Sequence, residues 1–246
     1  MTSRDSNWQG KTALITGAGS GIGRALACAL GAAGAQLLLV GRDRAKLQAA
    51  AAVEHAPSPP TCHACDLADE AQLEALVAKV AGSVPRLDVL AHSAGNFSLG
   101  GLADLSVQEL DRLYRTHLRA PYRLTQALLP QLRAAQGEVV FINSTAALQA
   151  SPTWAAYAAV KAGLKMLADG MRPELDAQGI RVLSVYPGRT ATPMQERVFH
   201  LEGRDYKPEE LLQPDDLAAR IVNLLELPRT AEATDLIVKP MKKVVR

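Results

Sequence analysis

Short apolar runs alternate with longer amphipathic stretches along most of this chain. The apolar run at 12–15 is followed by a helical pattern over 22–33 and by a second apolar run at 36–40. This order is typical of a strand, a helix and a second, parallel strand. The alternation continues through apolar runs at 62–67, 87–91, 138–142, 180–185 and 236–238.

Seven strand-like runs in this order predict an α/β fold. We expect one doubly wound parallel sheet of the Rossmann type, with helices on both faces. No internal repeat and no linker is visible, so residues 1–246 are interpreted as a single domain. A chain of 246 residues with 48% hydrophobic content can bury a sizeable core.

Charge and hydropathy exclude some partners. A net charge of +2 gives no reason to expect nucleic acid or an anionic membrane surface. The apolar stretch 25–40 is too short for a membrane span and is interrupted by Gly31, Gly34 and Gln36. The first residues contain no apolar signal region, so we expect a cytoplasmic protein.

The three cysteines raise the question of a metal or redox site. Cys62 and Cys65 stand three residues apart with His63 between them. In an extended strand, residues at this spacing point to opposite faces, and a zinc site needs more ligands than these. We therefore interpret them as buried strand cysteines and expect no metal.

A glycine-rich turn follows the first apolar run. Gly17, Gly21 and Gly23, with Gly19 between them, precede the predicted helix. Glycines let a pyrophosphate approach the backbone, and the helix N-terminus offers free N–H groups to its charge. The alternative is that the glycines serve only tight strand-to-helix packing. Four glycines after a clean strand favour a dinucleotide site.

The residue after the second strand bears on which dinucleotide binds. An acidic side chain there would accept hydrogen bonds from ribose hydroxyls, whereas this chain has Gly41 and Arg42. Arg42 can pair with a 2′-phosphate, which favours NADP(H) over NAD(H). The alternative is a solvated arginine at a helix start that is capped by Asp43.

Tyr157 and Lys161 form an i, i+4 pair that places both side chains on one helix face. An unperturbed tyrosine has a pKa of about 10, so acid–base work near neutrality needs a shift of about 3 units. A cation about 4 Å away at an effective dielectric near 20 supplies about 4 kcal/mol, so Lys161 is a plausible cause of such a shift, aided by the nicotinamide charge. Ser144, after the run 138–142, adds a hydroxyl that could hold a reacting oxygen.

Five motifs in chain order resemble those of the short-chain dehydrogenases/reductases, and the resemblance covers essentially the whole chain. They are the glycine turn, the pair Asp66-Leu67, the strand-four motif His92-Ser93-Ala94-Gly95, the active-site residues Ser144, Tyr157 and Lys161, and Pro187, Gly188 and Thr192.

The resemblance implies a role for each matching residue. Tyr157 would exchange a proton with the substrate oxygen while Ser144 hydrogen-bonds it, and Lys161 would hold the nicotinamide ribose and acidify Tyr157. The Asp66 carboxylate would bind the adenine amino group, assisted by the Leu67 backbone. Hydride would pass directly between the nicotinamide and the substrate carbon. The implied cofactor-binding set is Gly17, Ser20, Gly21, Ile22, Gly23, Arg42, Asp66, Leu67, Ser93, Ala94, Gly95, Tyr157, Lys161, Pro187, Gly188, Thr190 and Thr192.

Two histidines depart from the family pattern. His92 and Ser93 stand where the family usually has two asparagines, and we interpret His92 as a core histidine with satisfied hydrogen bonds. His117 replaces an asparagine that holds a water beside the active-site lysine. One hypothesis is that His117 links Lys161 to solvent as a proton relay. The opposing hypothesis is a weakened relay in a cofactor-binding protein that turns over slowly.

The expected substrate side is mainly apolar and includes Ser144, Gln149, Trp154, Tyr157 and Met194. Residues 193–212 resemble a lid. Met194, Val198 and Phe199 at helical spacing are more often the packing face of a short helix than substrate contacts. We expect a moderately apolar ketone, aldehyde or alcohol as substrate.

Two further expectations concern assembly and function class. The family commonly pairs the helices that match 118–132 and 154–175, so we expect a homo-oligomer, a dimer or tetramer. Three function classes stay open: an NADP(H)-dependent oxidoreductase, a regulatory dinucleotide-binding protein, and a scaffold for partner binding. The presence of Tyr157 and Lys161 favours the first.

Overall fold

The computed structural model describes residues 8–52, 58–149 and 151–242. Seven strands form one sheet in the order β3-β2-β1-β4-β5-β6-β7, and every pairing is parallel. The predicted fold class is thereby confirmed. The strands are β1 (Thr12–Thr16), β2 (Gln36–Gly41), β3 (Thr61–Ala64), β4 (Val89–His92), β5 (Glu138–Ile142), β6 (Arg181–Pro187) and β7 (Asp235–Val238).

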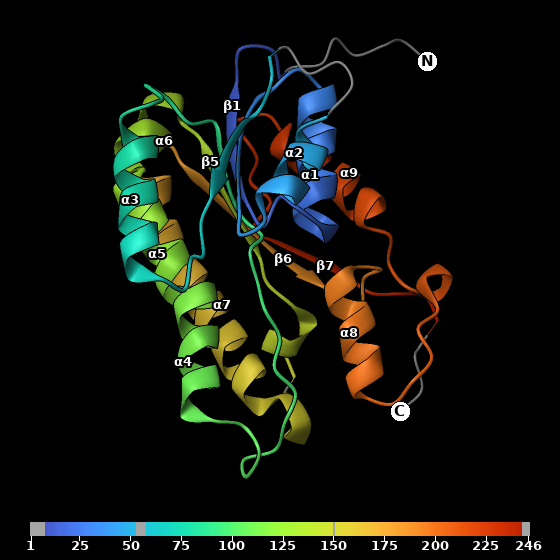
Figure 1. Cartoon of the computed structure of the whole chain (residues 1–246). Coiled ribbons are helices and arrows are strands. Elements are labelled where there is room, and N and C mark those ends of the chain that lie inside the picture. Colours follow the sequence, from blue (N-terminus) through green and yellow to red (C-terminus); the bar gives the residue numbers. More distant parts are fainter. Residues whose placement is uncertain (1–7, 53–57, 150, 243–246) are drawn as a thin grey trace.

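Helices cover both faces of this sheet (Figure 1). One face carries α1 (Gly21–Ala32), α2 (Arg44–Ala51) and α9 (Pro214–Leu225), whose apolar side chains form one buried cluster with the strands. The other face carries α3 (Glu70–Ala81), α5 (Ala120–Ala127), α6 (Leu129–Ala135) and α7 (Ala155–Asp176), which form a second cluster. Apolar burial on both faces explains why the strands are continuous apolar runs.

Three further helices lie near the carboxyl ends of the strands. They are α4 (Val107–Tyr114), the π-helix η1 (Arg115–Arg119) and α8 (Pro193–Leu201). Ser106 begins α4 with a capping box, in which its hydroxyl accepts from the Glu109 N–H and the Glu109 carboxylate accepts in return. The π-helix joins α4 to α5 and contains His117.

The largest boundary error in the predicted strands is at β3, which ends at Ala64 and not at 67. The Cys65 N–H still bonds to the Gly41 carbonyl at 2.9 Å, but the Asp66 carboxylate accepts from the Ala68 N–H and closes a turn. A carboxylate that bonds to its own backbone two residues on competes with the strand ladder.

The two neighbouring cysteines lie on opposite faces of the sheet, as predicted. Cys62 is half-buried and packs against the first apolar cluster, while Cys65 is buried in the second. Both are free thiols, and burial raises the pKa of Cys65 to about 11. Within the described residues, no group of three or more metal-ligating side chains comes together.

Candidate active site

A cavity of about 580 Å³ opens at the carboxyl ends of the strands, where the order reverses between β1 and β4. This is where ligands bind in open α/β sheets. The cavity brings together most of the predicted site residues. Those in its lining are Gly17, Ser20, Gly21, Ile22, Arg42, Asp66, Leu67, Ser93, Ala94, Gly95, His117, Ser144, Tyr157, Lys161, Pro187, Gly188, Thr190, Thr192 and Met194.

Three predicted residues lie outside this lining. Gly23 stands behind the turn, where an added Cβ would approach the Gly17 carbonyl oxygen to 2.5 Å. Gln149 is exposed, on the loop after β5. Trp154 precedes α7 and packs edge-on against Phe97, with ring centres 6.4 Å apart.

The glycine turn serves both packing and the cavity. Gly17 has φ +69°, and an added Cβ would lie 2.7 Å from the Ala94 Cα. Gly21 has φ +53°, and an added Cβ there would lie 2.9 Å from Thr192 Cγ2. Since Ser20 makes no side-chain cap bond, the first N–H groups of α1 face the cavity without a side-chain acceptor from the cap. The packing interpretation therefore holds for the turn, and its uncapped N–H groups are compatible with an anionic ligand.

Basic side chains line the cavity beside β2 and α2. Arg42 lines it, and Asp43 caps α2 by accepting from the Lys46 N–H at 3.1 Å. Lys46 also lines the cavity, as does Arg112, which pairs with Asp66 at 3.3 Å. The sequence analysis missed Lys46 and Arg112, because neither belongs to a motif and both reach the cavity only through the fold.

Ser144, Tyr157 and Lys161 converge from two elements. Ser144 follows β5, where its N–H donates to Asn143 Oδ1 at 2.9 Å and its Oγ accepts from the Ala146 N–H at 3.1 Å. Tyr157 and Lys161 lie one turn apart on α7. Lys161 Nζ donates to the Ile142 carbonyl at 2.9 Å and stands 5.8 Å from the centre of the Tyr157 ring.

Burial dominates the titration of this group. It raises the pKa of Tyr157 to about 12, although a hydrogen bond with Ser144 lowers it. It also lowers the pKa of Lys161 to about 7. The protein's own groups therefore do not produce the expected acidification of Tyr157, because the lysine charge is itself disfavoured by desolvation.

The two unusual histidines lie in different surroundings. His92 stacks on Phe141 with ring centres 5.1 Å apart, and its Nε2 bonds to Thr125 Oγ1 at 2.9 Å. Burial lowers the pKa of His92 to about 3, so the interpretation as a core histidine is confirmed. His117 faces the cavity, with its ring edge-on to Tyr157 at 5.6 Å.

His117 is held by the loop after β4. Its Nε2 lies 2.8 Å from the Asn96 carbonyl oxygen, while Nδ1 has no partner within the part of the chain that the structure describes. Burial, followed by the charge of Lys161, lowers the pKa of His117 well below 6.5. His117 lies in the π-helix η1, and such turns, although rare, are frequently found at functional sites.

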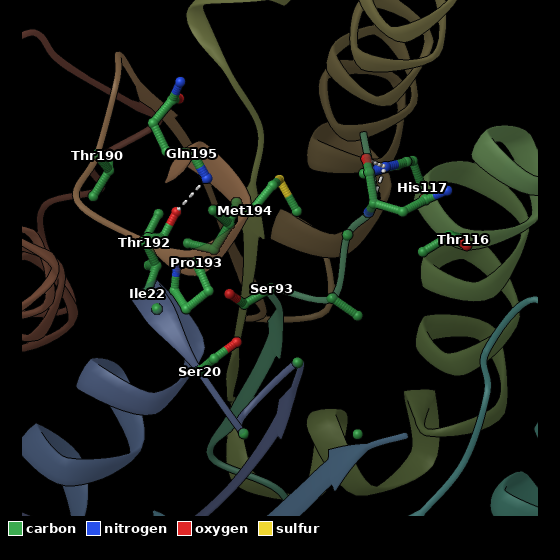
Figure 2. A pocket seen from close by; sticks show the side chains of 18 of the residues that line it. Ser20, Ile22, Ser93, Thr116, His117, Thr190, Thr192, Pro193, Met194 and Gln195 are labelled. Carbon is green, nitrogen blue, oxygen red and sulfur yellow. Dashed lines mark hydrogen bonds between the residues drawn. The ribbon is translucent and has the colours of Figure 1, made fainter. Parts of the chain in front are cut away.

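The first turn of helix α8 forms one wall of the cavity. Thr192 caps it by accepting from the Gln195 N–H at 3.2 Å. Figure 2 shows Thr192, Pro193 and Met194 on one side of the cavity and His117 on the other. Val198 and Phe199 are buried, so the packing interpretation holds for them and the cavity interpretation for Met194. Phe97, whose ring lies 4.9 Å from that of Tyr157, was missed.

Comparison with known proteins decides the family. The family model described as short chain dehydrogenase matches residues 11–203. The chain belongs to the short-chain dehydrogenase family. It is 32% identical over 240 residues, 96% of this chain and 93% of the relative, to an uncharacterized short-chain type dehydrogenase/reductase of Sinorhizobium fredii. It is 31% identical to an uncharacterized oxidoreductase of Staphylococcus haemolyticus, with coverage of 94% and 98%.

Solved structures agree with this assignment. A metagenomic short-chain oxidoreductase in complex with NADP is similar with a TM-score of 0.80 and 32% identity, covering 96% of this chain and 99% of that one. A short-chain dehydrogenase from Sphingobium yanoikuyae in complex with NADPH has a TM-score of 0.80 and 28% identity, covering 92% and 87%. This short-chain dehydrogenase is an oxidoreductase that acts on CH–OH groups. Among its described helices, none is long and apolar enough to cross a bilayer.

Proposed function

We propose that the chain is an NADP(H)-dependent oxidoreductase that interconverts a ketone or aldehyde and an alcohol by direct hydride transfer. The observation that carries this proposal is the convergence of Ser144, Tyr157 and Lys161 in the cavity that also holds the glycine turn and Arg42. A dinucleotide laid along the cavity would have the turn at its pyrophosphate and this group at its reactive end.

Each residue of the group has a distinct task. Ser144 holds the substrate oxygen by a hydrogen bond, and Tyr157 exchanges a proton with the same oxygen. When bound, the nicotinamide supplies or accepts the hydride, and its oxidised ring adds a positive charge. Because the pKa of Tyr157 is raised to about 12 by burial, we infer that this added charge and Lys161 act together to bring the phenol into its working range.

The proposed preference for NADP(H) rests on Arg42. It lines the cavity just after β2, it is exposed, and no carboxylate in the described part of the chain pairs with it. Its guanidinium is thus available to a 2′-phosphate, which it can contact through two N–H groups. Capping of α2 by Asp43 is compatible with this role, because the cap uses the aspartate alone.

The substrate and the assembly are further parts of the proposal. Met194 and the Tyr157 ring line the reactive end, and the Phe97 ring packs against that of Tyr157, which favours a moderately apolar carbonyl compound. Exposed apolar side chains on α4, α5 and α7 favour a homo-oligomer, and light scattering in solution tests this. They are Val107, Leu110, Tyr114, Tyr122 and Met166.

Cofactor titration tests the binding half of the proposal. NADPH is expected to bind more tightly than NADH, and Arg42→Ala is expected to weaken NADPH about tenfold or more while leaving NADH unchanged. Arg44→Ala is the matched control, because Arg44 is exposed nearby but lies outside the cavity lining. Equal loss of both cofactors in Arg42→Ala would refute the assignment to the 2′-phosphate.

Turnover tests the chemical half. NADPH consumption against ketones, aldehydes and 3-oxoacyl thioesters is expected to be lost in Tyr157→Phe, with cofactor binding retained. Tyr114→Phe is the control, since that phenol is exposed on α4. Binding without turnover in the wild type on every substrate would favour a regulatory dinucleotide-binding protein, and absence of binding would exclude both.

A further inference from the structure

Arg189 is a largely buried cation next to the cavity that has no part in the proposed chemistry. It follows Gly188 in the loop after β6, and its side chain is only 19% exposed. Its Nη2 contacts both carboxylate oxygens of Glu202, at 2.7 and 2.8 Å, and Glu202 is 16% exposed. Two opposite charges so far removed from water form a strong restraint, because removing either one leaves the other buried and unpaired.

The position of Glu202 is itself informative. Glu202 is the C-cap of α8, where the helix dipole disfavours a negative charge. Arg189 compensates for this charge, and Arg204 Nη1 approaches the same carboxylate at 3.8 Å. The C-terminal end of α8 thus depends on cations that come from outside the helix.

The Arg189 guanidinium also contacts two aromatic rings from different elements. It lies 4.8 Å from the centre of the Phe199 ring on α8 and 6.0 Å from that of Trp154, just before α7. Phe199 is 4% exposed. A cation between two rings at these distances attracts both. Arg189 therefore connects α8, which contributes Met194 to the cavity, with the segment that leads to Tyr157.

The Arg189 backbone binds the C-terminal end of the 193–212 segment, which begins with α8. The Leu212 N–H donates to the Arg189 carbonyl at 3.1 Å, and the Ala191 N–H donates to the Leu212 carbonyl at 2.8 Å. The 193–212 segment therefore begins and ends beside the loop of Arg189. The backbone of this loop binds the end of the segment at Leu212, and the Arg189 side chain binds its middle at Phe199 and Glu202.

We propose that Arg189 is a positioning residue that holds the 193–212 segment against Trp154, in the turn Pro152–Trp154 before α7, and so sets the affinity of the site for cofactor and substrate. The reacting groups lie just after β5 and on α7, and Arg189 contacts the turn before α7 and not these groups. Loss of Arg189 should therefore raise KM while leaving kcat nearly unchanged. This kinetic part rests on the proposed function, whereas the structural part does not.

The structural part is tested without cofactor or substrate. Trp154 and Trp8 are the two tryptophans of the chain, so Trp8→Phe leaves Trp154 as the single reporter. In that background, Arg189→Met is expected to increase acrylamide quenching of Trp154 several-fold. Trypsin is expected to cleave after Arg197 and Arg204 about tenfold faster, because local opening exposes the segment.

A matched control separates this effect from general loss of stability. Arg172 is 14% exposed and pairs with Asp169 on α7, away from the cavity lining. Arg172→Met should leave quenching and cleavage at the wild-type level. Glu202→Gln should reproduce Arg189→Met, and the double variant should be no worse than either single one. Unchanged quenching and cleavage in Arg189→Met would overturn the proposal.

Kinetics then test the consequence. In Arg189→Met, KM for NADPH and for the carbonyl substrate is expected to rise about tenfold with kcat within twofold of the wild type. A fall in kcat at unchanged KM would overturn the positioning role. If no substrate is turned over by the wild type, the proposed function fails, but the quenching and cleavage results still decide the structural claim.

Discussion

His117 lies beside two other titratable groups of the site, Tyr157 and Lys161. Burial, followed by the charge of Lys161, lowers the pKa of His117 well below 6.5, so the ring is neutral at pH 7. Nε2 lies 2.8 Å from the Asn96 carbonyl oxygen and 3.3 Å from the Asn96 backbone nitrogen; the shorter contact assigns the proton to Nε2 and leaves Nδ1 as an acceptor inside the site. An acceptor there could take a proton passed from Lys161, as the relay hypothesis requires.

The relay hypothesis predicts a change in pH dependence. An asparagine at position 117 can hydrogen-bond to the Asn96 backbone but cannot titrate. We therefore expect the pH–rate profile of His117→Asn to differ from the wild type on the acid limb, because the pKa of His117 lies well below 6.5. His200→Asn, at an exposed position on α8, is the control. Superimposable profiles would leave His117 with a positioning role only.

The glycine turn shows how strongly an element depends on one backbone position. Gly17 combines φ +69° with backbone atoms of the loop after β4 at 2.7 to 2.8 Å from an added Cβ. Neither the turn nor that loop can move away, because Thr16 Oγ1 accepts from the N–H groups of Ser93 and Ala94 at 3.1 Å. Gly17→Ala should therefore strain both loops.

Urea unfolding measures this strain. Gly17→Ala is expected to lower the free energy of unfolding by about 2–4 kcal/mol. Gly170→Ala is the contrasting variant, because nothing lies within 4 Å of its added Cβ in the middle of α7. That substitution should raise the free energy of unfolding by up to about 1 kcal/mol. Similar losses in both variants would contradict the account of the turn.

At the element scale, apolar periodicity was sufficient to predict the strands and the first helix. The helix predicted over 22–33 is found as α1 from Gly21 to Ala32, and the strand at 138–142 has the predicted limits. The π-helix around His117 was not predicted, and the contact that holds His117 within it comes from Asn96 in another element. Short-range sequence patterns carry no information on such contacts.

In the candidate site, too, local sequence patterns were informative and contacts between distant elements were not predicted. Motif residues such as Ser144, Tyr157 and Lys161 were predicted from the resemblance to the family, and the structure places them in one cavity. Arg112 and Arg189 were not, because each gains its role from a partner far away in the chain, Asp66 in one case and Trp154 in the other. The direction of the Tyr157 pKa was also missed, since burial is a property of the folded molecule.

For the whole molecule, the buried histidines imply a loss of stability in acid. His92 has a pKa of about 3 in the folded state against 6.5 when exposed, and the pKa of His117 is shifted in the same direction. Below pH 6.5 the unfolded chain therefore binds protons that the folded chain excludes. The contribution to stability is fully present above pH 6.5 and is lost as the pH falls towards 3.

The free energy of unfolding should thus fall by about 2 kcal/mol for His92 alone between pH 7.5 and pH 5. His92→Gln keeps a group that can bond to Thr125 and removes the titration, so its unfolding free energy should depend less on pH over this range. His200→Asn should leave the slope unchanged, because that side chain is exposed in both states. A His92→Gln slope equal to that of the wild type would show that His92 takes up its proton in the folded protein, and that its buried position between Phe141 and Thr125 opens in acid before the molecule unfolds.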